Sequence, residues 1–177
     1  SMGDRVWVGT SIENQDAANE RIPEILKMPK WITKFLSMEP LLGPVNSYVT
    51  STFEGFDVVI DYLRGTMSID GQAHVPCNKV NWVIAGGESG THARPMNPDW
   101  VRSIRNECVD AGIPFLFKQW GAWLPYDVRY SDKYPQNMGS SDHAVLEGSL
   151  FTKVGKHNSG RLLDGQEWNQ FPQQARS

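Results

Sequence analysis

Two kinds of hydrophobic pattern alternate along most of the chain. Short apolar runs with the length of strands occupy residues 5–12, 33–38, 80–86 and 114–121. Residues with helical spacing follow the first and third of these runs. Apolar runs joined by amphipathic helices are typical of parallel strands with crossover connections. The pattern predicts an α/β fold of parallel βα units, arranged either as an open sheet or as half of a TIM-like barrel.

Both predicted helices have recognisable end signals. Asn14 is expected to cap the first helix, and Asn97 followed by Pro98 to begin the second. An asparagine side chain accepts a hydrogen bond from the free N–H groups at a helix start. Proline is well suited to the first helical position, because the N–H group that it lacks would have no partner within the helix. Gly112 is expected to end the second helix, because glycine readily takes the left-handed conformation found there.

Residues 46–79 depart from this alternation and are interpreted as an excursion from the main pattern. The segment 56–65 has apolar residues at helical spacing, so a helix is expected there. Asp70-Gly71 stands between alternating residues, which predicts a hairpin.

The remaining residues are interpreted as parts of one α/β domain that spans 4–177. A region around 127–150 is expected to be irregular, with a strand at 149–155 after it. Residues 1–3 look like a cloning scar and are left out of the fold.

Composition narrows the classes of function. A net charge of −3 and a pI near 5.8 argue against a general nucleic-acid binder, although a local basic patch remains open. No apolar run approaches the length of a membrane span and no signal peptide is recognised, so a cytoplasmic location and no membrane partner are expected. The two cysteines, Cys77 and Cys108, lack the spacing of a zinc or iron–sulfur site, so no metal ligands are predicted.

Polar and ionisable residues follow all four predicted strands, where parallel α/β folds place their sites. Three of them are candidate catalytic residues: Glu39, Glu88 and Lys118. Six more are candidate ligand-binding residues: Ser11, Gly86, Gly87, Ser89, Arg94 and Gln119. A lysine inside an apolar strand needs a charged partner, so an ion pair of Lys118 with Glu39 or with Glu88 is predicted. Such a pair would set the ionisation of the carboxylates, or it would be purely structural.

The tail leaves two interpretations open. Its basic residues form a strip that would suit nucleic acid or phosphate: Lys153, Lys156, His157 and Arg161. The favoured alternative is a segment that folds back over the sheet through Leu162, Leu163 and Trp168.

Four blocks of the chain resemble a family of uncharacterised phage and prophage proteins. They are "VGTSIENQDAANERIPEIL", "FLSMEPLLGPV", "WVIAGGESGTHARPMNPDWVRSIRNECVDAGIPFLFKQWG" and "VGKHNSGRLLDGQEWNQFP". Full-length members carry three closely spaced cysteines, similar to the cluster motif of radical S-adenosylmethionine enzymes, which use a β/α barrel. "AGGES" is similar to the Gly-Gly-Glu motif that holds the amino group of that cofactor. The resemblance implies that this chain is either the C-terminal half of such a barrel or a naturally shortened member of the family.

The expected function rests on two observations, the polar residues at the strand ends and the family resemblance. The chain would form one wall of a site for a small polar ligand, with S-adenosylmethionine and an iron–sulfur cluster as cofactors of a full-length enzyme. Without the cysteines, this chain alone would hold no cofactor cluster and would be inactive. The alternative is a non-catalytic phage accessory module that binds protein or nucleic acid.

Overall fold

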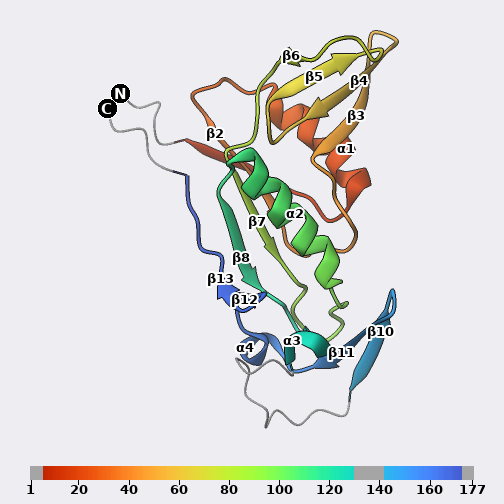
Figure 1. The fold of residues 1–177 in the computed structure, drawn as a ribbon, viewed down its shortest axis with the longest axis vertical. Helices are drawn as coiled ribbons and strands as arrows, with labels where there is room; N and C mark the ends of the chain where they lie inside the picture. Colours follow the sequence, from red (N-terminus) through yellow and green to blue (C-terminus); the bar gives the residue numbers. More distant parts are fainter. Residues whose placement is uncertain (1–5, 130–141, 173–177) are drawn as a thin grey trace.

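A parallel sheet forms the centre of the computed structural model, which describes residues 6–129 and 142–172 (Figure 1). The strand order is β1-β2-β7-β8, and every neighbouring pair is parallel. The bounds of the strands are Trp7–Ser11, Thr33–Met38, Trp82–Gly86 and Phe115–Gln119. These are the four strands that the apolar runs predicted, so the parallel α/β pattern is confirmed.

Two crossover helices are also confirmed, α1 at Gln15–Leu26 and α2 at Pro98–Ala111. The Asn14 side chain accepts a hydrogen bond from the Ala17 N–H at 3.0 Å. The Asn97 side chain accepts one from the Asp99 N–H at 2.9 Å. Gly112 ends α2 with a φ of 65°, in the left-handed region that glycine adopts without a steric penalty.

Both helices cover the same face of the parallel sheet. Cross-strand neighbours point to the same side of a sheet, and the register pairs Leu36 with Val83 and Val83 with Phe115. These three side chains are buried in one core with Ile22 of α1 and Ile104 of α2.

No helix covers the opposite face within the described residues. The four strands do not close into a barrel there, so the half-barrel is not confirmed.

The excursion between β2 and β7 is an antiparallel sheet. Its strands follow one another in the order β3-β4-β5-β6, at one end of the molecule (Figure 1). Their bounds are Tyr48–Phe53, Phe56–Asp61, Thr66–Ile69 and Val75–Pro76. This sheet takes the place that a crossover helix has in the other two connections.

The helix expected over 56–65 is wrong, because this segment contains strand β4. Glu54 and Gly55 have φ values of 51° and 87° and form a two-residue turn that pairs Phe53 with Phe56. Turns of this kind match the twist of antiparallel strands. The hairpin predicted at Asp70-Gly71 is confirmed, with φ values of 48° and 70° between β5 and β6.

The C-terminal third adds two small antiparallel sheets. One has the order β10-β11-β9, and the other is the hairpin of β12 with β13. The strands span Trp123–Pro125 (β9), His143–Leu146 (β10), Ser149–Lys153 (β11), Leu162–Leu163 (β12) and Gln166–Glu167 (β13). Two short helices, α3 at Tyr126–Arg129 and α4 at Lys156–Ser159, complete it. The strand expected at 149–155 is confirmed. The irregular region expected around 127–150 is wrong at β10, and its part over 130–141 lies outside the described residues.

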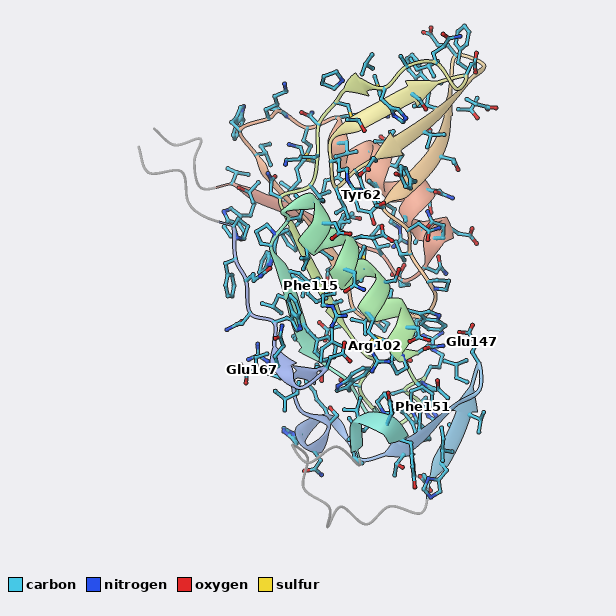
Figure 2. The ribbon with its side chains drawn as sticks, viewed as in Figure 1. Tyr62, Arg102, Phe115, Glu147, Phe151 and Glu167 are labelled. Carbon is cyan, nitrogen blue, oxygen red and sulfur yellow. The ribbon has the colours of Figure 1, made fainter. Side chains whose placement is uncertain are left out.

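Charged side chains fasten these C-terminal segments to α2. The Arg102 guanidinium donates to Asp164 at 2.8 Å and to Asp127 at 3.2 Å. The Asn97 side chain donates to the Glu147 carboxylate, in the turn between β10 and β11, at 2.7 Å. Figure 2 shows Arg102 and Glu147 beside the N-terminal half of α2. This half of α2 therefore anchors segments that follow it by 25 to 62 residues.

The tail folds back along the outer edge of β8, as favoured from the sequence. The Phe117 N–H donates to the Trp168 carbonyl at 2.9 Å, and the Gln170 N–H donates to the Phe115 carbonyl at 3.1 Å. Leu163 is fully buried in the core. The tail is therefore part of the fold.

We expect Leu163→Ala to lower the free energy of unfolding by about 2–5 kcal/mol, because it leaves a cavity in the core beside β8. Leu150→Ala is the matched control, because Leu150 is 39% exposed and the same truncation there should cost about 1 kcal/mol or less. Urea unfolding followed by tryptophan fluorescence measures both values. Equal losses would show that the tail does not pack as described.

Candidate functional site

Three side chains from two strand ends meet at the carboxyl edge of the sheet. Lys118 Nζ lies 2.8 Å from Glu39 Oε2, and Gln119 Nε2 donates to Glu39 Oε1 at 2.9 Å. Glu39 follows β2, whereas Lys118 and Gln119 end β8, so the contacts cross the intervening strand β7. Of the two ion pairs predicted for Lys118, the one with Glu39 is confirmed.

Gly86 explains how Glu39 reaches across β7. A β-carbon at this position would lie 3.5 Å from the carboxyl carbon of Glu39 and 3.3 Å from the Gln119 carbonyl oxygen. A larger side chain would therefore occupy the path of the Glu39 carboxylate. Gly86 positions the ion pair by leaving this space free.

Gly87 permits a still closer approach between the ends of β7 and β8. A β-carbon there would overlap the Trp120 carbonyl. The Gly87 N–H donates to the Gln119 carbonyl at 2.9 Å, and the Ala122 N–H donates to the Glu88 carbonyl at 2.7 Å. Gly87 is buried, so its backbone serves this contact within the chain.

Glu88 forms a separate pair with Arg94. The Arg94 backbone N–H donates to Glu88 Oε2 at 2.7 Å, and its guanidinium holds both carboxylate oxygens at 2.9 Å. The hydrogen bonds from the Arg94 side chain lower the pKa of Glu88 below its usual value. The expectation that Lys118 sets the ionisation of Glu88 is therefore wrong, because Arg94 has that role.

The two candidate serines differ in their surroundings. Ser89 Oγ lies 3.3 Å from Gln119 Nε2, so it belongs to the group around Glu39. Ser11 ends the edge strand β1, where its carbonyl accepts a hydrogen bond from Arg21 at 2.7 Å. Arg21 also pairs with Glu13 at 2.9 Å. Ser11 therefore lies in an exposed cluster of its own.

A cavity of about 510 Å³ opens on the helix-free face of the sheet, beside the Glu39–Lys118 pair. Its apolar floor includes Ile84 and Leu116, which are register partners on this face. Its polar lining comes from Ser37, Glu39, Lys118, Arg161 and Asn169, and Phe171 also lines it. The volume lies within the range of about 300–1,000 Å³ that is usual for small-molecule sites.

Arg161 was expected only as part of the basic strip of the tail, and Asn169 was not a candidate residue. They come from the tail, where the Arg161 guanidinium donates to the Asn169 side chain at 3.3 Å. Asp164 and Gly165, with φ values of 52° and 78°, make the turn between β12 and β13. The Asp-Gly pair after Leu162 and Leu163 is a hairpin signal that could have predicted this turn.

One buried acceptor beside Glu39 lacks a partner. Gln119 is 4% exposed, and its Oε1 has no hydrogen-bond partner among the described residues. A buried amide oxygen without a donor costs about 1–3 kcal/mol, and such groups are rare in proteins. A donor group on a ligand at this edge would satisfy it.

The two cysteines do not fit an iron–sulfur cluster. Both are free thiols, and Cys108 is buried in the core on α2, where desolvation raises its pKa. The described part of the chain contains no group of three His, Cys, Asp or Glu residues arranged to hold a metal ion. Over the same residues, no helix is long and apolar enough to span a membrane.

A family model described as "Protein of unknown function (DUF5131)" matches residues 1–172. Searches of curated proteins and of solved structures found no match. The comparisons thus give a family without an activity. The likeness to phage proteins and to radical S-adenosylmethionine enzymes remains a resemblance.

We expect Glu88→Gln to lower stability at neutral pH and to lose this effect in acid. The pKa of Glu88 is lower in the folded protein than the value of about 4.3 for a free glutamate. Its contribution is therefore complete above that value and is lost as the pH falls through the lowered pKa.

Urea unfolding of the wild type and Glu88→Gln between pH 7 and pH 2 measures the effect. The difference in midpoint should stay constant down to about pH 5 and should shrink below about pH 4. Glu20→Gln, an exposed change in α1, controls for the loss of one carboxylate. A Glu88→Gln difference that persists unchanged to pH 2 would contradict the role of Arg94.

Proposed function

The chain belongs to the DUF5131 family of proteins of unknown function, and we propose that it binds a small zwitterionic ligand on the helix-free face of its parallel sheet. The ligand would carry an ammonium group and a carboxylate, and S-adenosylmethionine is the first candidate. Its place is the 510 Å³ cavity beside the Glu39–Lys118 pair.

The observation that carries the proposal is a pair of opposite charges beside an apolar floor. Glu39 and Lys118 both line the cavity, and Arg161 adds a second cation. A zwitterion can bind both members of such a pair. Its ammonium binds the Glu39 carboxylate, and its carboxylate binds the Lys118 and Arg161 cations. Charge-assisted hydrogen bonds of this kind are about twice as strong as neutral ones.

The unpaired Gln119 oxygen supports the same orientation. Gln119 Nε2 donates to Glu39, which places the amide next to the carboxylate that would hold the ammonium. Gln119 does not itself line the cavity, so its side chain would have to turn toward the ligand for Oε1 to accept one of the three N–H donors of an ammonium. This contact would satisfy the acceptor that the described residues leave without a donor.

The proposal assigns roles to two of the three candidate catalytic residues. Glu39 would bind the ligand ammonium or exchange a proton with it, and Lys118 would hold the carboxylate. Glu88 does not line the cavity and is paired with Arg94.

S-Adenosylmethionine supplies an activated sulfonium when bound. Radical chemistry on it would need a cluster that the two cysteines of this chain do not hold.

We expect the wild type to bind S-adenosylmethionine in isothermal titration calorimetry. Glu39→Gln and Lys118→Gln should each weaken binding about tenfold or more, because each removes a charged hydrogen-bond partner. Glu20→Gln and Lys156→Gln are the matched controls, since they make the same chemical changes at exposed positions outside the cavity. They should bind as the wild type does.

Two outcomes would overturn the proposal. One is binding that Glu39→Gln and Lys118→Gln leave unchanged. The other is no binding of S-adenosylmethionine or of methionine, its zwitterionic part. Binding of a DNA oligonucleotide that disappears at high salt, without binding of either zwitterion, would instead favour the non-catalytic accessory module.

A further inference from the structure

A second cavity, of about 250 Å³, lies at the amino edge of the parallel sheet. Three segments that are distant in the sequence converge on it: the loop into β2, the turn between β4 and β5, and the connection from β6 to β7. Two of these segments, the turn between β4 and β5 and the connection from β6 to β7, belong to the end of the molecule that holds the β3–β6 sheet, opposite the C-terminal sheets (Figure 1). It shares no lining residue with the cavity beside Glu39.

Its charge is positive, although the chain carries a net charge of −3. Four cations line it, Lys30, Lys34, Arg64 and Lys79, and no carboxylate does. Among the described residues, neither Lys30, Lys34 nor Lys79 lies within ion-pair distance of an acidic group. Lysines grouped in this way repel one another, and a bound anion removes that repulsion.

Lys34 is the central group of this cavity because it is almost fully buried. It is 2% exposed, and its Nζ donates to the Pro29 carbonyl at 2.9 Å and to the Ile32 carbonyl at 3.2 Å. A lysine ammonium has three donors, so one N–H remains for another acceptor. Burial lowers the pKa of Lys34, which shows that its charge is held at a free-energy cost that an anion would offset.

Arg64 is fixed at the rim by the chain itself. Its guanidinium donates to Asp61 at 3.0 Å, and the same carboxylate accepts hydrogen bonds from the backbone N–H groups of Leu63 and Arg64. Asp61 is 3% exposed and does not line the cavity. This contact holds one edge of the guanidinium and leaves the remaining N–H donors of Arg64 free for an acceptor.

We propose that this cavity binds the terminal phosphate group of a small phosphorylated molecule. A phosphate dianion offers several acceptor oxygens to lysine and arginine donors that approach from different sides. The volume is below the usual range for a whole drug-sized ligand, so it suits a compact anionic head group. The two cavities are independent, so failure of one proposal leaves the other standing.

The test is calorimetric titration with inorganic phosphate at low ionic strength. We expect the wild type to bind, and Lys30→Gln with Lys79→Gln to bind at least tenfold more weakly. Both lysines are exposed, so this double variant should keep the fold, which circular dichroism verifies. Lys27→Gln with Lys156→Gln is the matched control, because it removes the same charge at exposed positions that do not line the cavity.

Further variants separate this cavity from the other one. Lys34→Met should abolish phosphate binding if it folds, and Lys118→Gln should leave binding unchanged. Equal affinities for the two double variants would overturn the proposal, as would phosphate binding that Lys118→Gln removes. A polynucleotide that binds in the absence of any phosphate binding would also overturn it, because the site would then recognise a phosphodiester chain.

Discussion

The close backbone approach between Gly87 and Trp120 is the constraint on which the carboxyl edge of the sheet depends. A β-carbon at Gly87 would overlap the Trp120 carbonyl, so no other residue fits without moving one of the strand ends. The contact coincides with the register shift that pairs Gly86 with Gln119. This shift places Lys118 and Gln119 together within reach of Glu39. The contacts of Glu39 with Lys118 and Gln119 therefore depend on two glycines that lack side chains.

The sequence was sufficient for the parallel sheet but not for the excursion. Apolar runs of strand length and helix caps are strong local signals, so four strands and two helices were predicted at nearly their observed bounds. The segment 56–65 was misjudged because its apolar residues satisfy a helical period while forming a strand. Glu54 and Gly55 decide the outcome through a two-residue turn, and Glu-Gly is a weaker turn signal than Asp-Gly.

Part of the candidate site was predictable from the parallel topology of the sheet. Parallel topology brings strand ends to one edge, which is how Glu39, Lys118 and Gln119 were grouped. The partner of Glu88 was missed because Arg94 reaches it through a loop that has no period to follow. Arg161 was predicted only as part of a basic strip, and Asn169 was missed, because the tail reaches the sheet by an antiparallel return at the edge of β8. The return of the tail was favoured from the sequence, but the local pattern does not identify which of its residues reach the sheet edge.

Charge is balanced differently at the two edges of the sheet. At the carboxyl edge, Lys118 has a carboxylate partner in Glu39. At the amino edge, Lys34 is held by two backbone carbonyl oxygens of the segment that follows α1. Dipoles stabilise a charge without neutralising it, so a lysine held in this way keeps its attraction for an anion. A zwitterion therefore suits the first edge, where both charges are present, and a phosphate suits the second edge, whose cavity is lined by cations and no carboxylate.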